Sequence, residues 1–267
     1  IETLSDEHRG LILVTGATGV GKTTTLAAMV GHINRTRRQH VVTIEDPIEF
    51  LHDDDQCIIN QREVGIDTET YEEGLRRVLR QDPDVILIGE LRDRESAETA
   101  LQAAESGHLV LSTMHTVDAA ETLGRLVEFF PAAKQPQVRS ILAGVLKGVI
   151  SQRLLPRTDG GRIAAVEVMV ANARIRELIR DNKPEFVPEA IAEGAFFQMQ
   201  TLTKALIDLV VSGDVDQETA AAAAPNRHDF MIALDRALKE HAVQEGEEPA
   251  KDAEPEEPAV HDGHALR

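Results

Sequence analysis

Eight consecutive residues near the start of the chain have the types and the spacing needed to hold a nucleoside triphosphate. The segment Gly16-Ala17-Thr18-Gly19-Val20-Gly21-Lys22-Thr23 matches the pattern G-x-x-x-x-G-K-[ST] of a phosphate-binding loop. Its glycines let the backbone curl around an anion, and the helix expected after them directs its positive N-terminal end to the same point. We expect Lys22 to contact the β- and γ-phosphates, Thr23 to offer its hydroxyl to Mg²⁺, and Thr24 to complete the loop. The motif therefore predicts binding of Mg·ATP and its hydrolysis.

Two glutamates follow short apolar runs that have the character of buried strands, and both are candidates for the hydrolysis step. Glu90 comes directly after residues 85–89, a Walker B-like run in which the usual acid is aspartate. Because glutamate is one atom longer, we expect Glu90 to reach Mg²⁺ through water. Glu45 follows residues 41–44 and could polarise the attacking water, so we favour it as the general base. The alternative for each is a solvated acid in a loop.

Three basic side chains are further candidates. His115 follows the run 109–113 and could donate a hydrogen bond to the γ-phosphate, although a lone histidine is more often structural. Arg76 and Arg80 lie four residues apart on a predicted helix, beside its apolar stripe. This spacing suits a phosphate on a neighbouring subunit. From the residues alone, however, a solvated face or pairing with nearby acids is the favoured interpretation of the two arginines.

The elements that must position these residues alternate along the first part of the chain. Apolar and β-branched runs, typical of strands buried on both faces, occupy 11–15, 41–44, 85–88 and 109–113. Helical patterns occupy 70–81, 94–106, a segment opening at 118, and 137–153. A hairpin is expected from 153 to 170 with its turn at 159–161. This alternation predicts an α/β fold with a mainly parallel sheet.

The remainder of the chain is predicted to be helical and then disordered. Helices are expected at 173–181, 187–193, 200–212 and 227–241. Residues 243–267 are rich in Glu, Pro and Ala and hold too little apolar surface to order themselves. We therefore divide the chain into an ATPase core, 1–170, a C-terminal helical domain, 171–242, and a disordered acidic tail, 243–267.

Composition excludes several classes of function. The net charge of −18 leaves no general basic footprint for a phosphate backbone, which disfavours a nucleic-acid motor. Cys57 is the single cysteine, so neither an intrachain disulfide nor a cysteine-rich zinc site can form, and a reducing, cytoplasmic setting fits. We find no signal peptide and no apolar run long enough to span a membrane.

Taken together, the motifs resemble the type II/IV secretion system ATPases, a family of hexameric motors. The resemblance is carried by residues 43–49, 84–93 and 107–116. Within the family, the chain looks most like the ATPases that retract type IV pili. Matching segments are Asn60-Gln61-Arg62-Glu63-Val64, Met199-Gln200-Thr201-Leu202 and Ile175-Arg176-Glu177-Leu178-Ile179-Arg180-Asp181.

The resemblance implies a RecA-like core with a helical C-terminal part, assembled as a homohexamer. The ring would dock on an inner-membrane pilus platform protein at the cytoplasmic face of a bacterial membrane. It would power pilus retraction and twitching motility with ATP and Mg²⁺. Arg76 and Arg80 match the family's trans-acting arginines, and the roles given above to Glu45, Glu90 and His115 also follow the family pattern.

Departures from the family keep alternatives open. We expect the family's N-terminal PAS-like domain to be absent, which would leave a chain that binds ATP but turns it over poorly. A pilus assembly or type II secretion ATPase is the alternative within the family, and the missing four-cysteine zinc insert argues against it. A regulatory nucleotide-binding partner with little hydrolysis is the alternative of another class, and intact Lys22, Glu45 and Glu90 argue against that.

Overall fold

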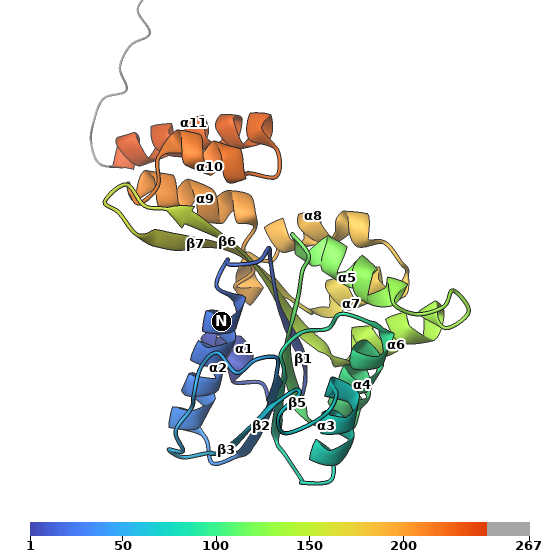
Figure 1. Cartoon of the computed structure of the whole chain (residues 1–267). Coiled ribbons are helices and arrows are strands. Elements are labelled where there is room, and N and C mark those ends of the chain that lie inside the picture. Colours follow the sequence, from blue (N-terminus) through green and yellow to red (C-terminus); the bar gives the residue numbers. More distant parts are fainter. Residues whose placement is uncertain (245–267) are drawn as a thin grey trace, which may run out of the picture.

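A seven-stranded sheet forms the centre of the protein in the computed structural model, which describes residues 1–244 (Figure 1). The strands are β1 Gly10–Thr15, β2 His40–Glu45, β3 Ile58–Glu63, β4 Val85–Ile88, β5 Leu109–Met114, β6 Leu146–Pro156 and β7 Arg162–Val170. Their order is β3-β2-β4-β5-β1-β6-β7, and every neighbouring pair is parallel except β6 and β7. The predicted α/β fold with a mainly parallel sheet is confirmed.

Helices cover both faces of this sheet. The first are α1 Glu2–Ser5, α2 Lys22–Thr36, α3 Tyr71–Val78, α4 Arg94–Glu105, α5 Ala119–Glu128 and α6 Gln135–Val145. In Figure 1, α1 and α2 lie on one side of the sheet, and α3 to α6 lie on the other. Successive residues of β1 show why both faces are apolar, because Ile12 packs with α2 whereas Leu11 and Leu13 pack with the helices opposite. The buried, nearly continuous apolar strands follow from this two-sided covering.

Polar side chains fix the beginnings of most of the helices that surround the site. Thr70 and Asp118 accept hydrogen bonds from the backbone N–H groups of Glu73 and Glu121, which confirms the predicted starts of α3 and α5. Helix α2 differs, because its N-cap residue is Gly21 and no side chain caps it. The first N–H groups of α2 are therefore left without a side-chain partner.

The helix predicted over residues 137–153 is wrong in its second half. Helix α6 ends at Val145, and the chain continues directly into β6, which pairs with β1 on one side and β7 on the other. The apolar spacing fits a helix, but the backbone groups of β6 are bonded to two neighbouring strands, and this tertiary pairing overrides the local pattern. Gly148 permits the close packing, since a Cβ there would lie 2.8 Å from the Leu4 side chain.

Three further elements were not predicted, and one predicted helix is shorter than expected. Strand β3, the short helix α1 and α10 Gln217–Ala223 are additions to the predicted set. Helix α3 ends at Val78, so Arg80 lies just past the helix and its C-cap residue Leu79. The predicted hairpin is present, and its turn holds Gly160 and Gly161 at φ of 96° and 79°.

The predicted C-terminal helices are present as α7 Ala173–Arg180, α8 Val187–Ala192, α9 Leu202–Val211 and α11 Arg227–Gln244, with short 3-10 turns at Pro184–Phe186 and Ala195–Phe197. The apolar side chains of α7 and α8 join the large core beneath α5 and α6. Those of α9 to α11 form a separate cluster with the end of the β6–β7 hairpin, around Leu206 and Phe230. The predicted acidic tail lies outside the described residues from residue 245 onward.

Candidate functional site

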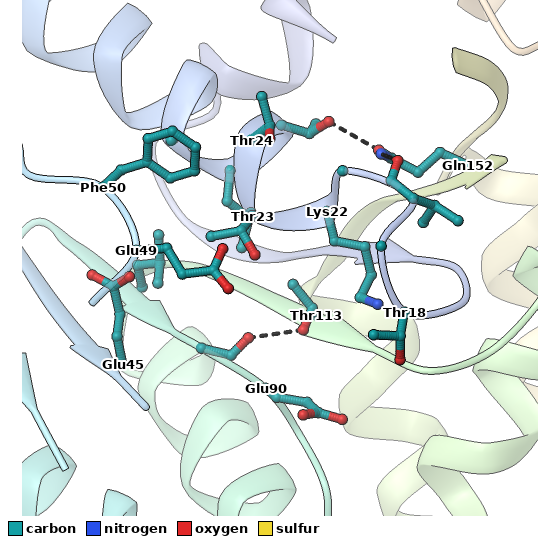
Figure 2. Close-up of a pocket in the computed structure, with 18 of the residues that line it drawn as sticks. Thr18, Lys22, Thr23, Thr24, Glu45, Glu49, Phe50, Glu90, Thr113 and Gln152 are labelled. Atoms are coloured by element: carbon teal, nitrogen blue, oxygen red, sulfur yellow. Dashed lines mark hydrogen bonds between the residues drawn. The ribbon is translucent and has the colours of Figure 1, made fainter. Parts of the chain in front are cut away.

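A cleft of about 590 Å³ opens where the carboxyl ends of β1, β2, β4 and β5 meet the N-terminus of α2 (Figure 2). This edge of a parallel sheet is where ligands usually bind. The lining includes the predicted residues Thr18, Gly19, Val20, Gly21, Lys22, Thr23, Thr24, Glu45, Glu90 and His115. The fold therefore brings together most of the residues that the sequence singled out.

The backbone of the loop between β1 and α2 has the shape that a bound anion requires. Gly16, Gly19 and Gly21 have φ values of 141°, 79° and 90°, in a region that side chains disfavour. These turns lead into the uncapped start of α2, whose N–H groups and helix dipole attract negative charge. The loop geometry thus fits a polyphosphate.

Lys22 places a cation inside the cleft. Its Nζ donates hydrogen bonds to the carbonyl oxygens of Gly16, at 2.9 Å, and Ala17, at 3.0 Å. The side chain is nearly buried, and this burial lowers the pKa of its ammonium group, whereas Glu90 and Glu49 oppose the shift. A phosphate beside Lys22 would favour the charged form in the same way as these acids do.

Glu90 is held from two sides by basic groups. Arg92 Nε donates to Glu90 Oε2 at 2.6 Å, and His115 Nε2 lies 3.1 Å from Glu90 Oε1. The hydrogen bond to Glu90 raises the pKa of Arg92, which also lies 3.8 Å from Asp46. The sequence predicted Glu90 and His115 but missed Arg92. The turn between β4 and α4 brings Arg92 back to the Glu90 carboxylate, to which it donates its hydrogen bond.

Glu45 is buried at the end of β2, with its carboxylate oriented by two neighbours. Thr43 Oγ1 donates to Glu45 Oε1 at 2.7 Å, and Gln61 Nε2 donates to the same oxygen at 3.2 Å. Both contacts come from strands β2 and β3, so Glu45 is fixed by the sheet and faces the same cleft as Glu90. These bonds fix the position of the Glu45 side chain, as a general base requires.

The cleft could hold Mg²⁺ only with help from a bound phosphate. Within residues 1–244 no group of three or more His, Cys, Asp or Glu side chains could hold a metal ion by itself. Mg²⁺ is commonly held by one or two protein oxygens together with phosphate oxygens and water. Thr23 and Glu90 supply such oxygens in this cleft, so the donor set fits the predicted ion.

Arg76 and Arg80 do not line the cleft of their own chain. Both are exposed, and Arg76 forms an ion pair with Glu72 one helical turn away. The pairing with a nearby acid, which the residues alone favoured, is therefore present for Arg76. A role in catalysis within the same chain is not supported for either arginine.

Two cleft residues escaped the sequence reasoning because they lie outside recognisable motifs. Tyr71, at the start of α3, lines the cleft, and burial raises the pKa of its phenol to about 12. Gln152, on β6, hydrogen-bonds to the loop from the far side. No local signal marked Gln152, because its partners lie far away in the sequence and its strand was predicted as a helix.

The fold and the cleft define a nucleotide-binding protein of the P-loop class. Residues 1–160 match the family model described as type II/IV secretion system protein, and the chain belongs to this family. The resemblance seen in the motifs is confirmed.

Named relatives agree with this assignment. The chain is 49% identical over 227 residues to "Type IV pilus retractation ATPase PilT" of Pseudomonas aeruginosa, which covers 85% of the chain and 66% of the relative. It is 47% identical to "Twitching motility protein" of Neisseria gonorrhoeae, over 86% of the chain and 62% of the relative. A crystal structure of the pilus retraction motor PilT with bound ADP superposes with a TM-score of 0.78 at 48% identity, covering 85% of this chain and 64% of that one. The chain thus spans slightly less than two thirds of the length of these relatives.

Proposed function

We propose that this chain is the motor portion of an ATPase that hydrolyses Mg·ATP to drive the retraction of a type IV pilus. The observation that carries the proposal is one cleft that joins an uncapped, glycine-rich helix start, a nearly buried lysine and two oriented carboxylates. The relatives named for pilus retraction and twitching motility support retraction, and not extension, of the pilus as the movement that is driven. We retain the division into a core, 1–170, and a helical domain, 171–242, as part of this proposal.

Each cleft residue has a role that follows from its position. The loop from Gly16 to Thr24 holds the phosphates through its N–H groups, and Lys22 adds a full positive charge. Glu45, fixed by Thr43 and Gln61, accepts the proton of the attacking water. Bound Mg²⁺, contacted by Thr23 and by Glu90 through water, would neutralise charge on the phosphates. His115 senses the γ-phosphate from its place beside Glu90.

The second part of the proposal is that subunits complete one another's sites in a homohexamer. Arg76 and Arg80 are exposed and lie outside the lining of their own cleft, so they could reach a neighbour's phosphate once Arg76 leaves Glu72. The exposed pair contributes about 0–1 kcal/mol, so breaking it costs little. The ring would act on an inner-membrane platform protein from the cytoplasmic side. Within residues 1–244 no helix is long and apolar enough to cross a membrane.

One alternative is a regulatory partner that binds nucleotide and hydrolyses little. The ordered carboxylates of Glu45 and Glu90 favour an enzyme, since a binding module needs neither of them. A motor for pilus assembly or type II secretion shares this cleft and differs in its partner.

The test of the proposal is phosphate release at saturating Mg·ATP by the whole chain and by three variants. Lys22→Ala should abolish turnover and weaken ADP binding, because it removes the cation that contacts the phosphates. Glu45→Gln and Glu90→Gln should each lower turnover about 10²–10⁴-fold and leave ADP bound. Turnover in Lys22→Ala equal to that of the unaltered chain would refute the assignment. Full turnover in Glu45→Gln would remove Glu45 as the general base.

A further inference from the structure

We propose that Gln152 is a positioning residue of the nucleotide site, whose side-chain amide braces the phosphate loop from strand β6. The inference rests on the proposed nucleotide binding and adds to it a residue outside every motif. Gln152 is 4% exposed and lines the cleft. Gln152 lies on β6, which neighbours β1 on one side of the sheet. Strand β4, which leads to Glu90, lies on the other side of β1.

The amide of Gln152 contacts the loop at two points. Its Nε2 donates to the carbonyl oxygen of Val20 at 2.6 Å, and its Oε1 accepts from Thr25 Oγ1 at 2.9 Å (Figure 2). Val20 is in the loop, and Thr25 is in the first turn of α2. The two bonds therefore hold both ends of the segment 21–24, which lines the cleft.

These partners determine the orientation of the amide. A carbonyl oxygen can only accept, so the nitrogen of Gln152 must face Val20, and this leaves its oxygen for the hydroxyl of Thr25. A glutamate at this position could accept from Thr25 but could not donate to Val20, and it would add negative charge next to the phosphates. Glutamine is thus suited to this place in a way that the acid of the same shape is not.

The backbone of β6 supports the loop as well. A Cβ on Gly16 would lie 2.5 Å from the carbonyl oxygen of Gln152, and a Cβ on Gly21 would lie 3.3 Å from its Nε2. One residue earlier, Ser151 Oγ accepts a hydrogen bond of 2.9 Å from Thr15 Oγ1 at the end of β1. Gly16 is therefore required by the close approach of the β6 backbone, in addition to any contact with phosphate, whereas a side chain at Gly21 would press only on the Gln152 amide.

A brace of this kind raises the affinity for nucleotide because it increases the fraction of chains whose phosphate loop has the binding conformation. A loop with three glycines at positive φ has many alternative conformations, and the apparent dissociation constant rises as the competent fraction falls. Losing both amide contacts should raise the dissociation constant of ADP about tenfold, which corresponds to about 1.4 kcal/mol. Because Gln152 need not touch the reacting atoms, the KM for ATP should rise much more than kcat falls.

The experiment is calorimetric titration of the whole chain with Mg·ADP, comparing Gln152→Met with the matched control Gln200→Met. Methionine keeps the length of the side chain and removes both polar atoms. Gln200 Nε2 donates to the carbonyl oxygen of Val166 at 2.9 Å, so the control loses a similar bond on the same hairpin, outside the cleft. We expect a tenfold rise for Gln152→Met and less than a twofold change for Gln200→Met. Thr25→Val, which removes one of the two partners, should raise the constant about threefold.

The possible results separate this inference from the proposed function. Unchanged ADP affinity in Gln152→Met overturns the brace alone, and equal losses in the two methionine variants do so as well, because they indicate general destabilisation. Should Gln152→Met fail to fold, unchanged affinity in Thr25→Val has the same consequence. If the unaltered chain and Lys22→Ala bind ADP equally, the nucleotide site itself is refuted, and the brace with it.

Discussion

Replacing Gly16 by alanine should damage the protein far more than the same change at Gly19, three residues along the same loop. At Gly19 a Cβ would meet nothing within 4 Å, so the substitution adds only the cost of a positive φ, here 79°. That cost is about 1–2 kcal/mol for an L-residue. At Gly16 the φ of 141° is less favourable still, and the Cβ would lie 2.5 Å from the Gln152 carbonyl oxygen and 2.7 Å from the Val20 side chain.

The overlap at Gly16 cannot be relieved by turning a side chain, because its closest partner is the backbone of β6, a strand paired on both sides. Overpacking of this kind typically costs about 1–3 kcal/mol, which gives a total of about 2–5 kcal/mol for Gly16→Ala. The assay is urea unfolding of the two variants without nucleotide, and the Gly16 variant should have the lower midpoint. Equal midpoints would show that β6 does not press against the loop, and would refute this explanation of the motif's first glycine.

Three further predictions concern ionisation and the cleft. Burial raises the pKa of Glu167 above its ordinary 4.5, although its carboxylate accepts a bond from the Ala119 N–H. The contribution of the protonated Glu167 side chain to the free energy of unfolding is full below pH 4.5. It is lost as the pH rises through the raised pKa. Glu167→Gln should therefore melt higher than the unaltered chain at neutral pH and equally below pH 4.5, and a constant difference would contradict the burial. Tyr71 is the only tyrosine, and its tyrosinate absorbance should appear with a midpoint of about 12 in the folded chain, against an ordinary 10.0; a midpoint of 10 in the folded chain would show an open phenol. Arg92→Ala should lower turnover while ADP still binds, since Glu90 loses its 2.6 Å partner, and normal turnover would make that contact incidental.

What the sequence could predict was local. The phosphate loop is a contiguous segment in which residue types dictate backbone shape, so its position and the helix that follows it were accessible from eight residues. Glu45 and Glu90 were found because each directly follows a buried apolar strand, and parallel strands deliver their carboxyl ends to one edge. The caps of α3 and α5 were equally local.

What the sequence could not predict depended on distant pairing. Strand β6 contains spacing that suits a helix, and only its position between β1 and β7 makes it a strand. Gln152 was missed for the same reason, since its contacts with Val20 and Thr25 exist only after the sheet has formed. Whether Arg76 acts on a neighbour depends on a second subunit, which no property of a single chain reveals.

The most direct test of the account is phosphate release by an equimolar mixture of Lys22→Ala and Arg76→Ala chains. Each variant alone should be nearly inactive, because one lacks the phosphate-binding lysine and the other lacks the arginine offered to its neighbour. In a mixed ring, a site is complete where Lys22 of one subunit meets Arg76 of the next, so random assembly should restore activity to about a quarter of the unaltered level. No recovery in the mixture, or full activity of Arg76→Ala alone, would contradict an ATPase whose site is completed between subunits.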